Sequence, residues 1–173
     1  MIGLETAGHR RLAERINGYR DAMAEFGDAG ERLVLMPPEC NGYHAGAEGL
    51  QRLLHNWPDI DGLFCMTDIL AVGALFECQR RGIAVPGQIA VMGYGNYDIA
   101  AEVPPGLSTV QTPGSEIGEQ AADLMLQRLG GTAVEAQQRR VDKQQGDGGR
   151  FRQRLAELDQ VPHGGHADLA SIH

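Results

Sequence analysis

Residues 62–68 read Gly62-Leu-Phe-Cys-Met-Thr-Asp68, an apolar run that ends in two polar residues able to cap a helix. A continuous apolar run is typical of a strand that is covered on both faces. The side chain of Thr67 or Asp68 can accept a backbone N–H at the start of a helix. The pattern that follows predicts a helix running to Arg81, ended by Gly82 in the left-handed conformation. A buried strand that leads into a helix is the repeating unit of a parallel sheet.

The same alternation extends in both directions along the chain. Apolar residues at helical spacing and short apolar runs predict the following elements: helices at 12–26, 47–57 and 117–129, and strands at 32–36, 88–92 and 109–110. We expect Ser115 to cap the last helix and residues 93–97, Gly93-Tyr-Gly-Asn-Tyr97, to form a loop. The order of elements predicts the α/β class, a Rossmann-like parallel sheet flanked by helices.

The composition excludes several classes of protein. The 173 residues, 42% of them hydrophobic, suffice for one moderate core but not for two full domains. The formal net charge of -8 provides no basic field for a phosphate backbone, so we expect no direct nucleic-acid binding by this chain. No apolar run approaches the roughly 20 residues of a membrane span, and the first residues do not resemble a secretory signal. A cytoplasmic location is therefore expected.

A change of composition near Gly130-Gly131 divides the chain. Residues 1–130 carry the alternating pattern. Residues 131–173 are rich in Gly, Gln and Arg and have only scattered apolar positions. We expect a folded unit over 1–130 and a divergent tail over 131–173 whose composition is typical of disorder.

The reactive side chains do not form a recognisable catalytic or metal-binding pattern. Cys40, Cys65 and Cys78 match neither a disulfide framework nor a paired metal or redox motif. We interpret them as reduced packing residues. The sequence therefore predicts no catalytic residue, no metal and no cofactor.

Polar residues follow several of the predicted strands. Ligands of an open parallel sheet bind beyond the carboxyl ends of the strands, where residues 37–43, Thr67-Asp68 and residues 93–96 fall. The helix that carries Arg15 can reach the same edge. Together these positions offer a cation, a hydroxyl group and amides, but no nucleophile with a base beside it. We therefore expect the binding of polyol hydroxyls or a carboxylate rather than catalysis.

Each of these residues also has a structural interpretation. Asp68 could serve only as an N-cap, Arg15 could be a solvated surface side chain, and Asn96 could be a turn residue. The stretch Gly93-Tyr-Gly95 begins like a dinucleotide-binding loop, but it lacks the third glycine and the helix that should follow. The pattern of residues leaves these alternatives open.

Several segments carry a resemblance to a known family when they are taken in order. They are Phe64-Cys-Met-Thr-Asp68, the stretch 71–86 that follows it, Ile89-Ala-Val-Met-Gly-Tyr94, and Pro104-Pro105-Gly-Leu-Ser-Thr-Val-Gln111. These segments resemble the sugar-sensing core of LacI/GalR-family transcriptional regulators. Within them, the stretch Leu75-Phe-Glu-Cys-Gln-Arg-Arg-Gly-Ile83, with Arg15-Ile-Asn-Gly-Tyr-Arg-Asp-Ala-Met23 upstream, is most similar to the gluconate-utilisation repressors. The resemblance covers roughly residues 8–130.

The resemblance implies a periplasmic-binding-protein-like effector domain, of which this chain holds the C-terminal subdomain. Closure of two such subdomains on a small sugar or sugar acid, such as gluconate, would be the allosteric signal of a repressor. The positions at which it implies ligand binding are Arg15, Thr67, Asp68, Gly95 and Asn96. Arg15 lies in an Arg-x-x-Gly-Tyr motif, and Thr67 replaces the usual Asn. The planar guanidinium of Arg15 would grip a carboxylate or adjacent hydroxyls.

The resemblance also implies partners. The helix at 70–81 and the loop at 98–103 correspond to the dimer interface of the family, so we expect a homodimer. DNA would be bound only through a headpiece that is absent from this chain, and no membrane is involved.

The chain departs from the family pattern near its start. In relatives, the segment matching Gly8-His-Arg-Arg11 leads into an apolar strand before the Arg15 helix, whereas here three residues join the two. We expect this strand to be deleted and Ile2-Gly-Leu4 to be too short to replace it. The helix that ends at Leu129 also needs a new packing partner. A small α/β enzyme acting on a sugar-like substrate and a nonfunctional remnant are the alternative hypotheses.

Overall fold

The computed structural model describes residues 1–5, 8–25 and 31–131. Strands and helices alternate through these residues in the following order: β1 (Ile2–Leu4), α1 (Arg10–Glu25), β2 (Val34–Met36), α2 (Tyr43–Asn56), β3 (Gly62–Phe64), α3 (Asp68–Arg81), β4 (Ala90–Gly95), α4 (Ile99–Glu102), β5 (Ser108–Gln111) and α5 (Gly114–Leu129). The predicted α/β class is confirmed. Residues 132–173, most of the expected tail, lie outside the described residues.

All the strand pairings within residues 1–5, 8–25 and 31–131 are parallel. β1 pairs with β2, and β3, β4 and β5 pair in that order. A parallel bridge between Ile2 and Cys65 places β1 beside the end of β3, and the Met66 amide donates to the Ile2 carbonyl oxygen at 2.9 Å. The strands therefore lie in the spatial order β2-β1-β3-β4-β5.

The expectation of a deleted first strand is wrong, because Ile2–Leu4 forms that strand. Ile2 pairs with Val34 and Leu4 with Met36, and all three residues of β1 are buried. Three residues are enough here because partners on both sides satisfy the backbone groups of the strand. The segment Gly8–Arg11, which the family resemblance suggested would lead into a strand, instead forms a turn at Gly8 and the first residues of α1.

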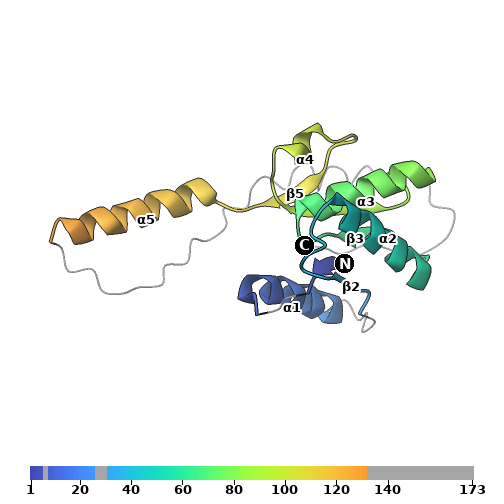
Figure 1. The fold of residues 1–173 in the computed structure, drawn as a ribbon, viewed down its shortest axis with the longest axis horizontal. Helices are drawn as coiled ribbons and strands as arrows, with labels where there is room; N and C mark the ends of the chain where they lie inside the picture. Colours follow the sequence, from blue (N-terminus) through green and yellow to red (C-terminus); the bar gives the residue numbers. More distant parts are fainter. Residues whose placement is uncertain (6–7, 26–30, 132–173) are drawn as a thin grey trace.

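The helices lie on both faces of the sheet. Figure 1 shows α1 on one side of the strands and the α2–α3 pair on the other, as right-handed crossovers require when the chain reverses direction along the sheet. α2 and α3 approach at two glycines. A methyl group at Gly46 would lie within 2.9 Å of three backbone atoms of Leu70, and one at Gly73 would overlap the Tyr43 carbonyl group. The two helix backbones therefore touch each other directly.

The core lies between these layers. It contains Ile2, Met36, Leu50, Leu53, Met66, Leu70 and Val72, each 1% exposed or less. α5 differs from the other long helices, because it has no buried residue and extends away from the sheet (Figure 1). Its side chains Met125, Leu126 and Leu129 are 65–78% exposed. The described residues thus provide no packing partner for its apolar stripe.

Local details differ from the sequence-based expectations at two places. β4 continues through Gly95, so the expected loop at 93–97 shrinks to the residues after it. Ser115 does not cap α5. It lies inside the first turn, where its hydroxyl contacts Glu119 at 3.4 Å, and the N-cap position is Pro113.

Candidate functional site

The strand order fixes where a ligand crevice can form. The chain moves outward from β1 to β2 and then returns past β1 to β3, so β1 and β3 flank the point at which the winding changes direction. Crevices in open α/β sheets form at the carboxyl ends of two such strands. The segment after β1 leads to α1, which carries Arg15, and the segment after β3 contains Thr67. We call this the ligand edge.

Arg15 reaches the ligand edge from α1. Its Nη1 donates to the Met66 carbonyl oxygen at 3.3 Å. Its guanidinium carbon lies 3.8 Å from the centre of the Tyr94 ring, a distance typical of a cation–π interaction. The side chain is half-buried, so the interpretation as a solvated surface arginine is wrong. The two contacts hold the guanidinium plane beside the residue that precedes Thr67.

Thr67 caps α3, and Asp68 does not. The Thr67 hydroxyl oxygen accepts the Leu70 amide at 3.3 Å, and Thr67 has the extended backbone of an N-cap. Asp68 is the first residue of the helix and is fully buried. The sequence left the cap open between these two neighbours, and the structure assigns it to the threonine.

The Asp68 carboxylate instead connects three segments of the chain. Its Oδ2 accepts the Tyr97 amide at 2.7 Å, and its Oδ1 accepts the Thr109 hydroxyl at 2.5 Å. Thr109 lies on β5 and also accepts the Asn96 amide at 3.2 Å. A charged group with no exposure is stable only when hydrogen bonds satisfy it, and both oxygens of Asp68 have partners.

Gly95 is the last residue of β4, and Asn96 begins the turn that follows it. Both have positive φ angles, +131° at Gly95 and +56° at Asn96. Asn96 tolerates this left-handed conformation better than most residues, so its interpretation as a turn residue is correct. Its side chain is also exposed, which leaves the amide group at the surface of the ligand edge.

The five positions singled out in the sequence therefore meet at one edge of the sheet, connected by a short series of contacts. Two further residues, Tyr94 and Thr109, complete the group and were not singled out from the sequence. Tyr94 directly precedes Gly95 in the sequence, so its position near the end of a predicted strand could have identified it as a candidate site residue. Thr109 had no such signal, because its partner Asp68 lies 41 residues earlier.

A cavity of about 400 Å³ lies elsewhere in the molecule. Its lining residues are Val34, Gln51, Arg52, His55 and Asn56. Val34 begins β2 and the other four lie in the second half of α2, which places the cavity at the amino ends of the strands. It includes none of the candidate ligand residues.

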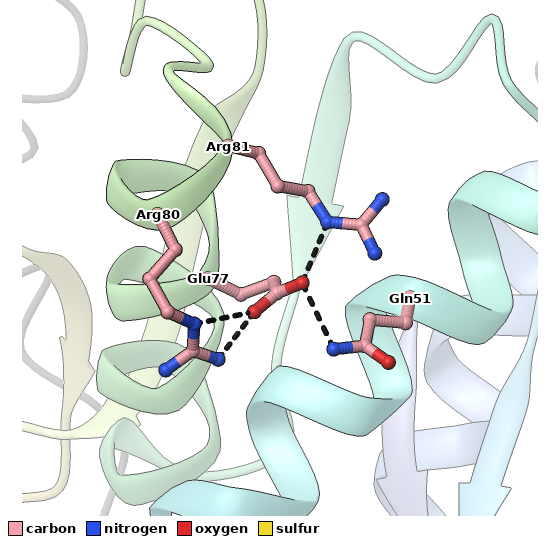
Figure 2. A network of polar contacts seen from close by, with 4 residues as sticks. All are labelled: Gln51, Glu77, Arg80 and Arg81. Atoms are coloured by element: carbon pink, nitrogen blue, oxygen red, sulfur yellow. Dashed lines mark hydrogen bonds and ion pairs between the residues drawn. The ribbon is translucent and has the colours of Figure 1, made fainter.

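A charged network joins α2 to α3 away from the ligand edge (Figure 2). The Glu77 side chain is 4% exposed and accepts Arg81 Nε at 2.6 Å, Gln51 Nε2 at 2.9 Å, and Arg80 Nε at 2.9 Å. Burial alone would raise the pKa of this carboxyl group, but the hydrogen bonds from Arg81, Arg80 and Gln51 outweigh it and hold the pKa below its ordinary value of 4.5. The network stabilises the helix pair and contacts no candidate ligand residue.

The cysteines fall into two classes. Cys65 and Cys78 are buried, whereas Cys40 is exposed. Burial raises the pKa of the Cys78 thiol to about 11 and also raises the pKa of Cys65. The packing interpretation is thus correct for the two buried thiols and wrong for Cys40.

Two features are absent from the residues that the structure describes. No group of three or more His, Cys, Asp and Glu side chains there could hold a metal ion. No helix in the same part of the chain has both the length and the apolar character of a membrane span.

Comparison with known proteins identifies what the chain is similar to. Residues 1–144 match a family described as "Periplasmic binding protein-like domain". The chain is 37% identical over 141 residues to the HTH-type transcriptional regulator GntR of Escherichia coli strain K12, and 35% identical over 119 residues to IdnR of the same strain. The alignments cover 73% and 69% of this chain but 41% and 35% of those relatives, so the chain spans less than half their length.

Solved structures give the same result. The transcription regulator GntR from Chromobacterium violaceum is 37% identical, with a TM-score of 0.70, over 78% of this chain and 50% of that one. A LacI family transcriptional regulator from Silicibacter pomeroyi is 31% identical, with a TM-score of 0.69, over 74% of this chain and 47% of that one. These relatives are transcriptional regulators, so the hypothesis of a small α/β enzyme is not supported.

Proposed function

Because the chain belongs to the periplasmic binding protein-like family and carries part of the ligand-binding domain of a LacI-family transcriptional regulator, we propose that it senses a sugar acid such as gluconate. The observation that carries the proposal is the position of Arg15. Its guanidinium lies at the ligand edge, held by Tyr94 and by the Met66 carbonyl oxygen.

The chemistry of Arg15 favours a carboxylate over a neutral sugar. A guanidinium has five N–H donors in a rigid plane, and the contact with Met66 uses one of them. A carboxylate accepts two parallel N–H groups of such a plane, which orients the ligand as well as attracting it. Contact with the Tyr94 ring fixes the plane in advance, so less side-chain freedom is lost on binding.

The remaining residues of the ligand edge would bind hydroxyl groups. The Thr67 oxygen already accepts the Leu70 amide, so its O–H remains a donor. The exposed amide of Asn96 offers both a donor and an acceptor. Gly95 has no side chain to block approach to the backbone. We propose that these residues line the polyol part of the ligand, with Asp68 behind them.

The whole regulator would use this binding to control transcription in the cytoplasm. We propose that it is a homodimeric repressor, that its DNA contacts are made by a headpiece, and that closure on the ligand changes the spacing of the two headpieces. A dimer surface on α3 is supported by Phe76, which is 41% exposed and contacts the Tyr43 ring edge-to-face at 6.2 Å between centroids.

Calorimetric titration tests the ligand proposal. Gluconate, glucose and glucose 6-phosphate would be titrated into the wild-type chain, Arg15→Ala and Arg15→Lys. Arg11→Ala is the matched control, because Arg11 is an exposed arginine on the same helix. We expect gluconate to bind about tenfold or more tightly than glucose, and both Arg15 variants to lose about tenfold or more of that affinity, as for the loss of one charge-assisted pair. Equal affinity for gluconate and glucose, or unchanged binding by Arg15→Ala, would refute the proposal.

Sedimentation tests the dimer separately. We expect the wild-type chain to be dimeric at micromolar concentration and Phe76→Asp to be monomeric, because a carboxylate would have to be desolvated in the interface. A monomeric wild-type chain would contradict this part of the proposal and leave the ligand part unaffected.

A further inference from the structure

Asp68 and Thr109, which lie behind the ligand edge, form hydrogen bonds with the turn that carries Asn96. We propose that Asp68 and Thr109 form a latch that fixes the turn at Gly95–Tyr97 and thereby positions Asn96 toward the ligand. In this role they act through the backbone of the turn and do not contact the ligand. The effect on ligand binding rests on the proposed function, whereas the effect on the turn does not.

The latch consists of three hydrogen bonds that run in one direction. The Asn96 amide donates to the Thr109 hydroxyl oxygen, and the Thr109 hydroxyl donates to Asp68 Oδ1. The Tyr97 amide donates to Asp68 Oδ2. Because a carboxylate can only accept, the Thr109 proton must point toward Asp68, which leaves the threonine oxygen as the acceptor for Asn96. Two successive amides of the turn are thus held by one pair of side chains.

The backbone around the latch is shaped to admit the carboxylate. Gly93 and Thr109 are register partners on β4 and β5. A methyl group at Gly93 would overlap Asp68 Oδ1 and would lie 3.2 Å from Asp68 Cα. A glycine at this position of β4 leaves the space that the carboxylate fills, directly beside the threonine that it binds.

The conformation of the turn explains why a latch is needed. Asn96 has a φ angle of +56°, a left-handed conformation that asparagine tolerates better than most residues but that still costs free energy unless the surroundings stabilise it. The backbone N–H groups of Asn96 and Tyr97, which flank the Asn96 Cα, are the groups that the latch holds. Without the latch, the turn could relax and the Asn96 amide group would leave its position.

The contrast in exposure separates positioning from ligand contact. Asp68 is 0% exposed and both of its oxygens are occupied, so direct binding would require the latch to break. Asn96, in contrast to Asp68, is exposed, so a ligand can contact its side chain directly.

Three substitutions in the full chain test the latch. Thr109→Val removes the hydroxyl and keeps the shape of the side chain, and Thr109→Ser restores the hydroxyl. Thr112→Val is the matched control three residues along, where no contact of the threonine side chain is part of the latch. The first measurement is amide hydrogen exchange at Asn96 and Tyr97 by NMR, with amides of α2 as a reference for global stability. The second is the affinity for gluconate.

We expect Thr109→Val to speed exchange at Asn96 by about tenfold, as for the loss of one hydrogen bond, and to leave the α2 amides unchanged. Thr109→Ser and Thr112→Val should stay within a few-fold of the wild type. The affinity for gluconate should fall about tenfold in Thr109→Val alone. A merely structural threonine would change the α2 amides as much as the turn.

The possible outcomes are distinct. Unchanged exchange at Asn96 in Thr109→Val would refute the latch, and faster exchange with unchanged gluconate affinity would refute its role in positioning. If the wild-type chain does not bind gluconate, the proposed ligand fails, and the exchange measurement still decides the latch. If Thr109→Val does not fold, Thr109→Ala replaces it, because alanine also lacks the hydroxyl and is small enough to fit the same site. In that variant, faster exchange at Asn96 supports the latch and unchanged exchange refutes it.

Discussion

The direct contact between α2 and α3 makes Gly73 a sensitive position. A methyl group at Gly73 would lie 2.7 Å from the Tyr43 carbonyl carbon and closer still to its oxygen. That carbon distance is about 0.7 Å shorter than the 3.4 Å at which ordinary van der Waals contact begins. The Tyr43 carbonyl belongs to a helix backbone and cannot rotate away, so the substitution Gly73→Ala must push the two helices apart.

The size of the effect follows from two opposing terms. Overpacking of a filled interior costs about 3 kcal/mol at the upper end of its usual range. Replacing a helical glycine with alanine gains about 1 kcal/mol of intrinsic helix propensity. We therefore expect Gly73→Ala to lower the free energy of unfolding by about 2 kcal/mol.

Urea denaturation followed by circular dichroism and by Trp57 fluorescence measures this change. Gly18→Ala is the matched control, since Gly18 lies inside α1 and a methyl group there would meet nothing within 4 Å. We expect that control to be as stable as the wild type or up to about 1 kcal/mol more stable. If Gly73→Ala behaved like Gly18→Ala, the reasoning about direct backbone contact would be refuted.

Three further results are expected. Because the pKa of Glu77 is lower in the folded protein, its network contributes stability at neutral pH that is lost as the pH falls below 4.5. In urea titrations, the difference in unfolding free energy between the wild type and Glu77→Gln should shrink over that pH range. A difference that stays constant would contradict the assignment. At pH 8, a thiol reagent such as dithionitrobenzoate should label Cys40 rapidly and the two buried thiols only after unfolding, so three fast thiols would contradict the burial. Gly93→Ala should displace the Asp68 carboxylate and lower stability by about 1–3 kcal/mol, and an unchanged urea midpoint would argue against the close fit.

The parts of the fold that depend on local signals were predictable from the sequence. α3 is one case, since a capping residue, an apolar helical pattern and a final glycine all lie within one segment. Its cap is Thr67, and Gly82 has the expected left-handed conformation with a φ angle of 68°. Such signals depend on nearest neighbours along the chain and need no knowledge of the tertiary structure.

The parts that depend on distant partners were not predictable. β1 has three residues, and only its pairing with β2 and its bridge to Cys65 make it a strand. The role of Asp68 is similar, because it depends on Thr109 in another strand. Gly93 and Gly95 suggested a loop, yet Gly93 belongs to β4, where its missing side chain makes room for Asp68.

The location of the candidate site was predictable from the sequence, but the contacts between its side chains were not. Loops at the carboxyl ends of parallel strands converge by geometry, so the meeting of Arg15, Thr67 and Asn96 follows from the element order. The stacking of Arg15 on Tyr94 depends on side-chain conformations, which pattern analysis does not give.

The bridge at Ile2–Cys65 creates a narrow seam through the middle of the sheet. Among the strand backbone contacts of the described residues, only that bridge, with the hydrogen bond from the Met66 amide, joins the β1–β2 half to the β3–β5 half. The other pairings extend over three or four residues. α2 follows β2 and α3 follows β3, so the glycine contact between these helices clamps the two halves together from outside the sheet. Substitutions that separate α2 from α3 would therefore let the two halves of the sheet move apart at the crevice. Such a change on the helix-covered face would widen the space around Arg15.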